Sequence, residues 1–519
     1  MSRLRCTVSH VLFLAILGCV GVINGLGVNW GTIASHPLPP EIVVQLMKDN
    51  GINKVKLFDT DKTVLDALAG SGIEVMVALP NVYLANMASP DKAKAWVKQN
   101  VTSYLGPKAV NITYVAIGNE PFLQGYNGSF VNVTFPALKN VQNALNDAGV
   151  GSKIKATVPC NADVYYSPWN NPAPSGGIFR PDIVSEMKKI VDFQDKNGAP
   201  FIVNIYPFIS LYLGNGAFPT DYAFFDGISN PVKDNGRTYT NMFEANYDTL
   251  VAALDGVGHG NMTIMVGEMG WPTDGDVNAN AKNAQKFYGG LLKNLGSKKG
   301  TPRRPGIDIE VYLFGLVDED AKSLLPGTFE RHWGIFSYDG QPKFPIDFSG
   351  QGKNKSAVPA KNVTYLPNSW CMLNPKAGDL SKLDDQIKAA CEDADCTPLG
   401  FGSSCNGLDA AGNASYAFNA YYQLNYQTKC DFGGLGLVTK KNISQGTCKF
   451  NIQVDSHPAS EAPAPAPAPA QVAASAPKQK GYKEPKSASS SSAGSSMAPF
   501  TFFSALAFGA VLDLVLFCR

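Results

Sequence analysis

The sequence has almost no excess of charge of either sign. Its 519 residues include 44 Lys and Arg and 43 Asp and Glu, which leaves a formal net charge of +1. Recognition of nucleic acid or of another polyanion requires a concentrated basic surface. We therefore expect a neutral partner and no nucleic acid.

Two cofactor motifs are also missing. No Gly-x-Gly-x-x-Gly follows the first expected strand, which argues against a dinucleotide-binding fold. The cysteine-rich segment 371–448 contains neither histidine nor Cys-x-x-Cys, which argues against a zinc site. We expect no cofactor and no metal. Cys160 stands alone in the long first part of the chain and is expected to be a buried free thiol.

The N-terminus has the composition of a processing signal. Residues 1–25 combine the basic Arg3 and Arg5 with an apolar run, residues 11–20, that is too short to span a bilayer. They predict a cleaved signal peptide and therefore secretion. Secretion agrees with nine possible N-glycosylation sites, at Asn100, Asn111, Asn127, Asn132, Asn261, Asn354, Asn362, Asn413 and Asn442.

The C-terminus predicts attachment to a membrane. Residues 453–493 are rich in Pro, Ala and Ser and predict a disordered stalk. Residues 494–519 end in an apolar tail, which is typical either of one membrane span or of a removed glycosylphosphatidylinositol (GPI) signal. Asp513 inside the tail, with few residues beyond it, favours the lipid anchor. We place the attachment at Ser492.

Residues 26–348 show short apolar strands that alternate with longer amphipathic stretches. This alternation predicts an α/β fold, a (β/α)8 TIM barrel, rather than an open doubly wound sheet. Eight strands are expected, at residues 27–30, 55–58, 74–79, 114–117, 154–158, 201–206, 264–267 and 309–314.

Two of these strands end in the same way. Thr113-Tyr-Val-Ala-Ile-Gly-Asn-Glu-Pro121 and Thr263-Ile-Met-Val-Gly-Glu-Met-Gly-Trp-Pro272 each lead from an apolar strand into a glutamate and then a proline. Either glutamate alone is explained equally well as a surface turn residue. Active sites of such barrels form at the carboxyl ends of the strands. Glu120 and Glu268 are therefore expected to face one another across one opening.

Paired carboxylates across a neutral substrate are the groups that hydrolyse glycosides. A separation of ~5–5.5 Å gives retention of configuration, and one of ~6.5–9.5 Å gives inversion. Two carboxylates that lie close together cannot both ionise cheaply, so one keeps its proton. We assign the acid to Glu120 and the nucleophile to Glu268, which predicts a retaining enzyme.

Six motifs in the first part resemble, in order, plant glycoside hydrolase family 17. They are Gly27-Val-Asn-Trp-Gly31, Val55-Lys-Leu-Phe58, Ala116-Ile-Gly-Asn-Glu120, Asn204-Ile-Tyr-Pro-Phe208, Gly267-Glu-Met-Gly-Trp-Pro-Thr273 and Trp333-Gly-Ile-Phe336. The resemblance covers residues 26–348 and implies a retaining β-1,3-glucan endohydrolase with the same acid and nucleophile. It also implies substrate-binding roles for Asn119, Tyr206, Trp271, Glu319, Lys322 and Glu330. The last three could equally form a solvated loop.

After a polar linker, residues 349–368, a second and smaller domain is expected at residues 369–452. Its six cysteines predict three disulfides that stabilise a small core. Six cysteines allow 15 pairings, and only a local Cys391–Cys396 bridge is suggested by spacing. The cysteines are Cys371, Cys391, Cys396, Cys405, Cys430 and Cys448.

This second segment resembles the plant X8 module, also called carbohydrate-binding module family 43. The resemblance rests on Trp370-Cys371, Ala390-Cys391, Ser415-Tyr-Ala-Phe-Asn419, Tyr421-Tyr-Gln423 and Cys430-Asp-Phe432, and it implies binding of β-1,3-glucan. The aromatic residues suit stacking on sugar rings or a small core, and a purely structural cap is the alternative for the whole module.

Together these features predict a monomeric endo-β-1,3-glucanase that acts on callose-like polymer. We expect it in the cell wall, anchored to the outer leaflet of the plasma membrane. Two alternatives use the same sequence: a β-1,3-glucan transglycosylase that transfers the sugar to another glucan, and a non-catalytic wall-binding protein.

Overall fold

The structure is a computed structural model that describes residues 25–106, 109–214, 216, 218–228, 231–351 and 356–456. Almost all of the expected signal peptide, residues 457–493 of the expected stalk, and the anchor signal lie outside the described residues. So do the glycosylation candidate Asn354 and the lipidation candidate Ser492.

The first domain is built on a nine-stranded parallel sheet with the order β5-β4-β3-β2-β1-β13-β12-β9-β6. All eight expected strands are present, and the fifth is divided into β5 and β6. Because β5 pairs with β4 and β6 pairs with β9, the two halves close the sheet into a barrel. The predicted (β/α)8 fold is therefore confirmed. The strands are β1 Leu26–Asn29, β2 Lys54–Lys56, β3 Glu74–Leu79, β4 Asn111–Ile117, β5 Lys155–Thr157, β6 Pro159–Asn161, β9 Phe201–Asn204, β12 Ile264–Met269 and β13 Glu310–Leu313.

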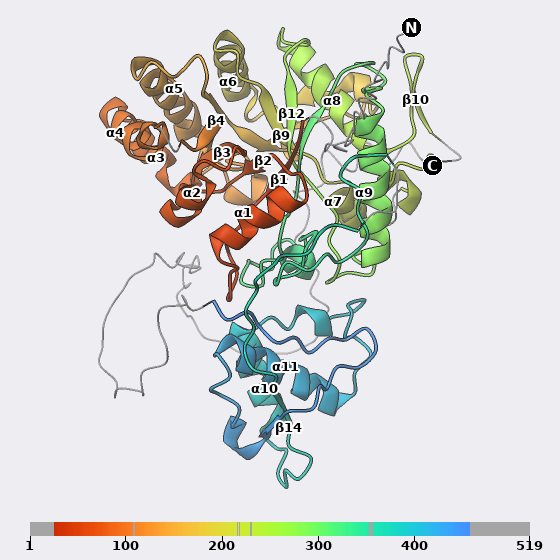
Figure 1. Cartoon of the computed structure of the whole chain (residues 1–519). Helices are drawn as coiled ribbons and strands as arrows, with labels where there is room; N and C mark the ends of the chain where they lie inside the picture. The colour runs from red at the N-terminus through yellow and green to blue at the C-terminus, as the bar shows by residue number, and fades with distance from the viewer. Residues whose placement is uncertain are drawn as a thin grey trace, which may run out of the picture.

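Helices surround this sheet and bury their apolar faces against it (Figure 1). Each barrel strand contributes three to seven mostly buried residues, and because the strands are parallel, their carboxyl ends lie on one face. The helices are α1 Pro40–Asp49, α2 Lys62–Leu68, α3 Leu84–Met87, α4 Pro90–Asn100, α5 Val131–Asp147, α6 Val184–Lys196, α7 Pro207–Gly214, α8 Met242–Gly256 and α9 Ala281–Gly296. Two short hairpins, β7 Tyr165–Tyr166 with β8 Ile178–Phe179 and β10 Val232–Asp234 with β11 Arg237–Tyr239, lie in the connections.

The second domain packs two helices, α10 Leu383–Asp393 and α11 Ala410–Leu424, with the antiparallel pair β14 Trp370–Leu373 and β15 Gly436–Thr439. Its six cysteines form three disulfides: Cys371–Cys430, Cys391–Cys396 and Cys405–Cys448. The local Cys391–Cys396 bridge agrees with its prediction from spacing. The buried free thiol predicted at Cys160 is also confirmed.

The aromatic residues of α11 divide between core and surface. Phe418 and Tyr422 are buried, and Phe418 stacks on Phe432 with ring centroids 3.9 Å apart. Tyr416 and Tyr421 are half-buried. Part of the aromatic set is therefore core, and the other part is partly exposed while packing on Phe450 and Phe432.

The residues between the domains are packed on the barrel. Asn50, just after α1, donates to the carbonyl of Val358 and accepts from its N–H at 2.9 and 2.8 Å. Farther along, Tyr365 forms a bridge with Val454, and the Val454 carbonyl contacts His36 Nδ1 at 2.8 Å. Residues 453–456, expected in the stalk, therefore belong to the folded part of the chain.

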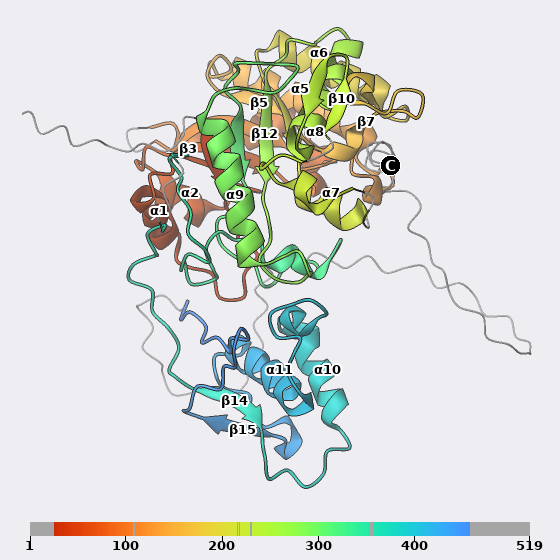
Figure 2. The same ribbon diagram turned by 90° about the vertical axis from the view of Figure 1, so that its right-hand side faces the viewer.

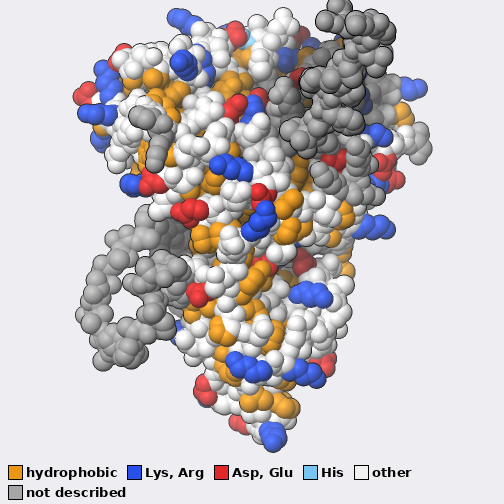
Figure 3. Space-filling model, in the orientation of Figure 1, with side chains coloured by type: hydrophobic (Ala, Val, Ile, Leu, Met, Phe, Trp, Pro, Cys, Tyr) orange, Lys and Arg blue, Asp and Glu red, His pale blue; other side chains and the backbone are white. Residues whose placement is uncertain are grey.

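Both views place the second domain as a separate unit beside the barrel (Figure 2). On the face drawn in Figure 3, acidic and basic side chains are interspersed, as the near-zero net charge predicts. Among the described residues, no helix is long and apolar enough to cross a bilayer. Six of the described candidate glycosylation sites have exposed side chains, whereas Asn100 and Asn413 are half-buried.

Candidate active site

Glu120 lies in a tight turn just beyond β4. Its backbone is left-handed, with φ of 52°, and Gly118 has φ of 74°. Asn81 holds this turn from the loop after β3: its side chain accepts from the N–H of Asn119 at 3.0 Å and donates to the Asn119 carbonyl at 2.8 Å. A Cβ at Gly118 would lie 2.3 Å from Asn81 Oδ1, so only glycine fits there. The turn aims Glu120 across the carboxyl ends of the strands.

Glu268 occupies the end of β12 and is almost entirely buried. Lys56, at the end of β2, donates to its Oε1 at 2.7 Å, and the hydroxyl of Tyr206 donates to its Oε2 at 2.6 Å. The Lys56 ammonium also donates to Asn29 Oδ1 at 3.0 Å and to Asn119 Oδ1 at 3.2 Å. Both Glu268 oxygens therefore have a fixed donor, which suits an ionised carboxylate.

The two glutamates lie in contrasting electrostatic surroundings. Burial and the nearby charge of Glu268 raise the pKa of Glu120 to about 8, although a hydrogen bond from Asn204 and the charge of Lys56 oppose this shift. Asn204 Nδ2 donates to Glu120 Oε1 at 2.9 Å. Burial, with the Glu268 charge second, raises the pKa of Tyr206, which therefore stays a hydrogen-bond donor. Glu120 thus keeps a proton at neutral pH while Glu268 is paired with a cation.

The predicted charged cluster lies beside this pair. Lys322 Nζ contacts Glu330 Oε2 at 3.0 Å, and both side chains are largely shielded from solvent. Burial opposes the charge on Lys322, but Glu330, Glu319 and the more distant Glu268 together raise its pKa. Glu319 instead accepts from the N–H of Ile33 at 3.0 Å, in the loop after β1. The cluster is a buried network and not a solvated loop.

Trp271 is not placed to contact a substrate. It is fully buried, stacks on Phe224 with centroids 4.6 Å apart, and donates its indole N–H to the Asn278 carbonyl at 2.9 Å. The prediction that Trp271 forms part of the wall of the substrate site is wrong, because its ring is packed in the core of the domain. Trp333 instead packs on Tyr206, with centroids 4.9 Å apart.

Sequence reasoning missed the polar residues that orient the two glutamates. Lys56, Asn81 and Asn204 received no role, although two of them lie in motifs that carry the family resemblance. A lysine inside the apolar stretch Val55-Lys-Leu-Phe58 was the available signal, since a buried cation requires a partner. In the described part of the chain, His, Cys, Asp and Glu form no group of three or more that could hold a metal ion.

The sequence profile of the glycosyl hydrolases family 17 matches residues 26–348, and that of the X8 domain matches residues 369–437. The chain is 62% identical over 463 residues to the Arabidopsis thaliana protein named glucan endo-1,3-beta-glucosidase 8, covering 89% of this chain and 95% of that protein. It is 52% identical over 444 residues to glucan endo-1,3-beta-glucosidase 5 of the same plant, covering 85% and 90%.

Solved structures resemble the barrel. CJP38, a β-1,3-glucanase and allergen of Cryptomeria japonica pollen, is 38% identical, with a TM-score of 0.59 over 62% of this chain and 99% of that one. A plant β-glucan endohydrolase is 34% identical, with a TM-score of 0.56 over the same shares of the two chains. The family match covers more than half of this chain. The protein belongs to the glycosyl hydrolases family 17 and carries an X8 domain after its barrel.

Proposed function

We propose that the protein is a retaining endo-hydrolase of β-1,3-glucan, with Glu120 as the general acid and base and Glu268 as the nucleophile. The observation that carries this proposal is that the two carboxyl groups lie in opposite surroundings: one favours the protonated form and the other the ionised form. Glu120 has a pKa raised to about 8, whereas Glu268 is bound to a lysine and a tyrosine hydroxyl. Carboxyl groups with such different environments divide into a proton donor and an ionised partner.

In the first step, the protonated Glu120 donates its proton to the glycosidic oxygen. The Glu268 carboxylate attacks the anomeric carbon, the bond to the leaving sugar breaks, and a glycosyl-enzyme forms. Tyr206, which keeps its proton, donates to the second Glu268 oxygen and fixes the direction of the attacking one.

In the second step, the proton balance reverses. Esterification removes the negative charge of Glu268, which is one of the causes of the raised Glu120 pKa, so that pKa falls. Glu120, now a carboxylate, accepts a proton from water, and the resulting hydroxide attacks the anomeric carbon. Glu268 leaves as a carboxylate, and the product keeps its original configuration.

The rim of the barrel suits a neutral sugar chain. Exposed aromatic residues lie in connections that follow the strands, where the site is: Tyr83, Tyr126, Trp169 and Tyr212. Aromatic faces bind the apolar faces of sugar rings without needing charge. The named relatives supply the linkage, β-1,3-glucan, which this geometry does not specify. We propose binding of the same polymer for the X8 domain.

The direct test is a reducing-sugar assay on linear β-1,3-glucan with wild type and Glu268→Gln. We expect the variant to lose turnover by at least about 10⁴-fold, since it has no nucleophile. Glu310→Gln is the matched control, because Glu310 pairs with Lys54 at 2.9 Å at the start of β13 and β2, the opposite end of the barrel from Glu268. Retained activity in Glu268→Gln would remove Glu268 from the mechanism. Early product of the β configuration, seen by NMR, supports retention, and longer chains formed at high oligosaccharide concentration would indicate a transglycosylase.

We also propose that the protein is secreted and anchored at the cell surface. This rests on the sequence of residues 1–25, on the stalk expected up to residue 493 and on the GPI signal expected at residues 494–519, with attachment at Ser492. An anchor and a glucan-binding domain both raise the local concentration of polymer at the barrel. Phosphatidylinositol-specific phospholipase C should release the protein from membranes; protein that stays bound would favour a membrane span.

A further inference from the structure

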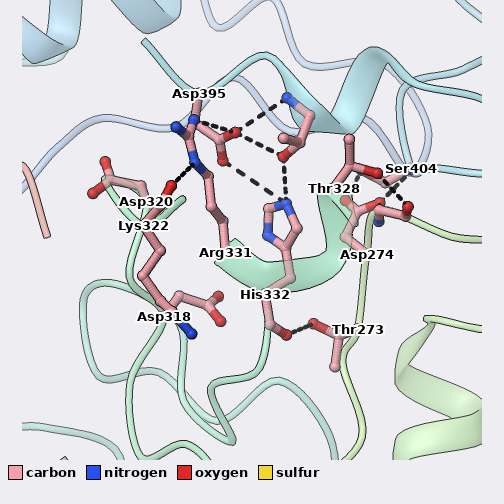
Figure 4. Close-up of polar contacts among 12 residues, drawn as sticks. Thr273, Asp274, Asp318, Asp320, Lys322, Thr328, Arg331, His332, Asp395 and Ser404 are labelled. Atoms are coloured by element: carbon pink, nitrogen blue, oxygen red, sulfur yellow. Dashed lines mark hydrogen bonds and ion pairs between the residues drawn. The ribbon is translucent and has the colours of Figure 1, made fainter. Parts of the chain in front are cut away.

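Among the barrel segments that contact the X8 domain are two loops of the barrel's catalytic face (Figure 4). One loop follows β12, the strand of Glu268, and there Asp274 accepts from the N–H of Ser404 at 2.9 Å. The other follows β13, and there His332 Nε2 contacts the Thr397 hydroxyl at 2.6 Å. The docking surface is therefore on the active-site side of the barrel.

The two barrel loops are joined to one another at this surface. The N–H of Thr273 donates to the His332 carbonyl at 3.0 Å, and the Thr328 hydroxyl donates to the Gly275 carbonyl at 2.6 Å. These two hydrogen bonds couple the positions of the two loops. Docking of the X8 domain on both loops constrains them as one unit.

Arg331 connects the X8 domain to the charged cluster of the site. Its Nη1 donates to Asp395 of the X8 domain at 3.1 Å, and its Nε donates to the Lys322 carbonyl at 3.0 Å. The side chains of Arg331 and Asp395 are each only 16% exposed, so this ion pair is shielded from solvent. One planar guanidinium thus holds both the second domain and the backbone of Lys322.

Besides the bond from Arg331, the Lys322 backbone is held by its own N–H, which donates to the Glu319 carbonyl at 3.2 Å. Residues 321–326 contain neither helix nor strand, and Leu325 is 82% exposed. The Lys322 ammonium nevertheless has to stay beside Glu330 and close to Glu268, in surroundings where burial opposes its charge. A buried ion pair is favourable only when its geometry is held.

We propose that the X8 domain, besides any glucan that it binds, is a positioning element of the catalytic centre. Through Asp395 and Arg331 it holds Lys322 beside Glu330 and close to Glu268. Turnover in the barrel therefore depends on docking even for a substrate too short to reach the X8 domain. This inference rests on the proposed hydrolase function.

The test compares Asp395→Lys with Asp393→Lys in the full-length protein. The first places a cation against Arg331 and breaks this ion pair, which is one of the docking contacts. The second adds the same charge two residues away at an exposed position and is the control. The substrate is a β-1,3-linked glucose pentasaccharide, and kcat is expressed per active site by titration with a covalent inactivator. We expect kcat of Asp395→Lys to fall about fivefold with little change in KM, and Asp393→Lys to match wild type.

Arg331→Lys keeps the charge but cannot reach both acceptors at once, so it should show a similar fall in kcat. The double variant should lose no more than either single one, because both changes break one connection. Equal kcat values for Asp395→Lys and Asp393→Lys, or independent additive losses, would overturn the proposal. A wild-type protein inactive on β-1,3-glucan would instead overturn the proposed function.

Discussion

Lys56 Nζ lies 2.7 Å from Glu268 Oε1, and their side chains are only 1% and 5% exposed. Burial lowers the pKa of Lys56, while the charge of Glu268 opposes that shift. Since each charge is buried, each depends on the other to remain in the interior. The ion pair therefore defines which glutamate is ionised in the resting site.

Replacing Lys56 with methionine should reduce kcat/KM about 10²-fold, because the nucleophile loses the cation that stabilises its charge. Lys54→Met is the control, since Lys54 lies two residues earlier on the same strand and pairs with Glu310 at the other end of the barrel. Equal activity in the two variants would contradict a role for Lys56.

Activity should fall as pH rises through about 8, because Glu120 has to be protonated to act as the acid and its pKa is raised to that value. The measurement is kcat/KM against pH, which reports groups of the free enzyme. The leaving group of a dinitrophenyl glycoside needs no proton. With this substrate, Glu120→Ala should still form the glycosyl-enzyme on Glu268, and the fall in activity at alkaline pH should disappear. An alkaline limb that persists in that variant would belong to another group.

Glu120 should also cost the protein stability at neutral pH. Its pKa is about 8 when folded and near 4.5 when unfolded, so its contribution is fully present below pH 4.5 and is lost as pH rises towards 8. At pH 7 the free energy of unfolding of Glu120→Gln should therefore exceed that of wild type by on the order of 1–3 kcal/mol, and the variant should unfold at a higher temperature. At pH 4 the difference should vanish; a constant difference would point to packing instead.

Asn81→Ala should lower kcat by about 10-fold or more with a smaller change in KM, because the turn that aims Glu120 loses both of its side-chain hydrogen bonds. Asn86→Ala is the matched control, since Asn86 lies nearby in α3 with an exposed side chain. Steady-state kinetics on a short β-1,3-oligosaccharide separates the two. Loss in both variants would indicate damage to the α3 region rather than misplacement of Glu120.

The barrel and its two glutamates followed from local patterns alone. Apolar runs of strand length ending in Gly-Asn-Glu and Gly-Glu mark the ends of β4 and β12, and chain order then places them on one face. Hydrophobic periodicity and the carboxyl-end rule are properties of short segments. They need no knowledge of the packed molecule.

The partners of those glutamates depended on the tertiary structure. Lys56 lies 212 positions from Glu268, and Asn204 lies 84 positions from Glu120. Asn81, which holds the turn of Glu120, lies 39 positions before that glutamate. Trp271 shows the converse, because its position next to the site in sequence does not say which way the indole points. It packs inward on Phe224.

The sequence by itself determined the fold class, the carboxylate pair and the cysteine-rich second domain, because each is encoded in residue types within one segment. Only the folded chain decided which charges are paired, which aromatic rings face inward, and that Asp395 meets Arg331. Such contacts join residues far apart in the chain, and their energies depend on burial, which no short pattern contains.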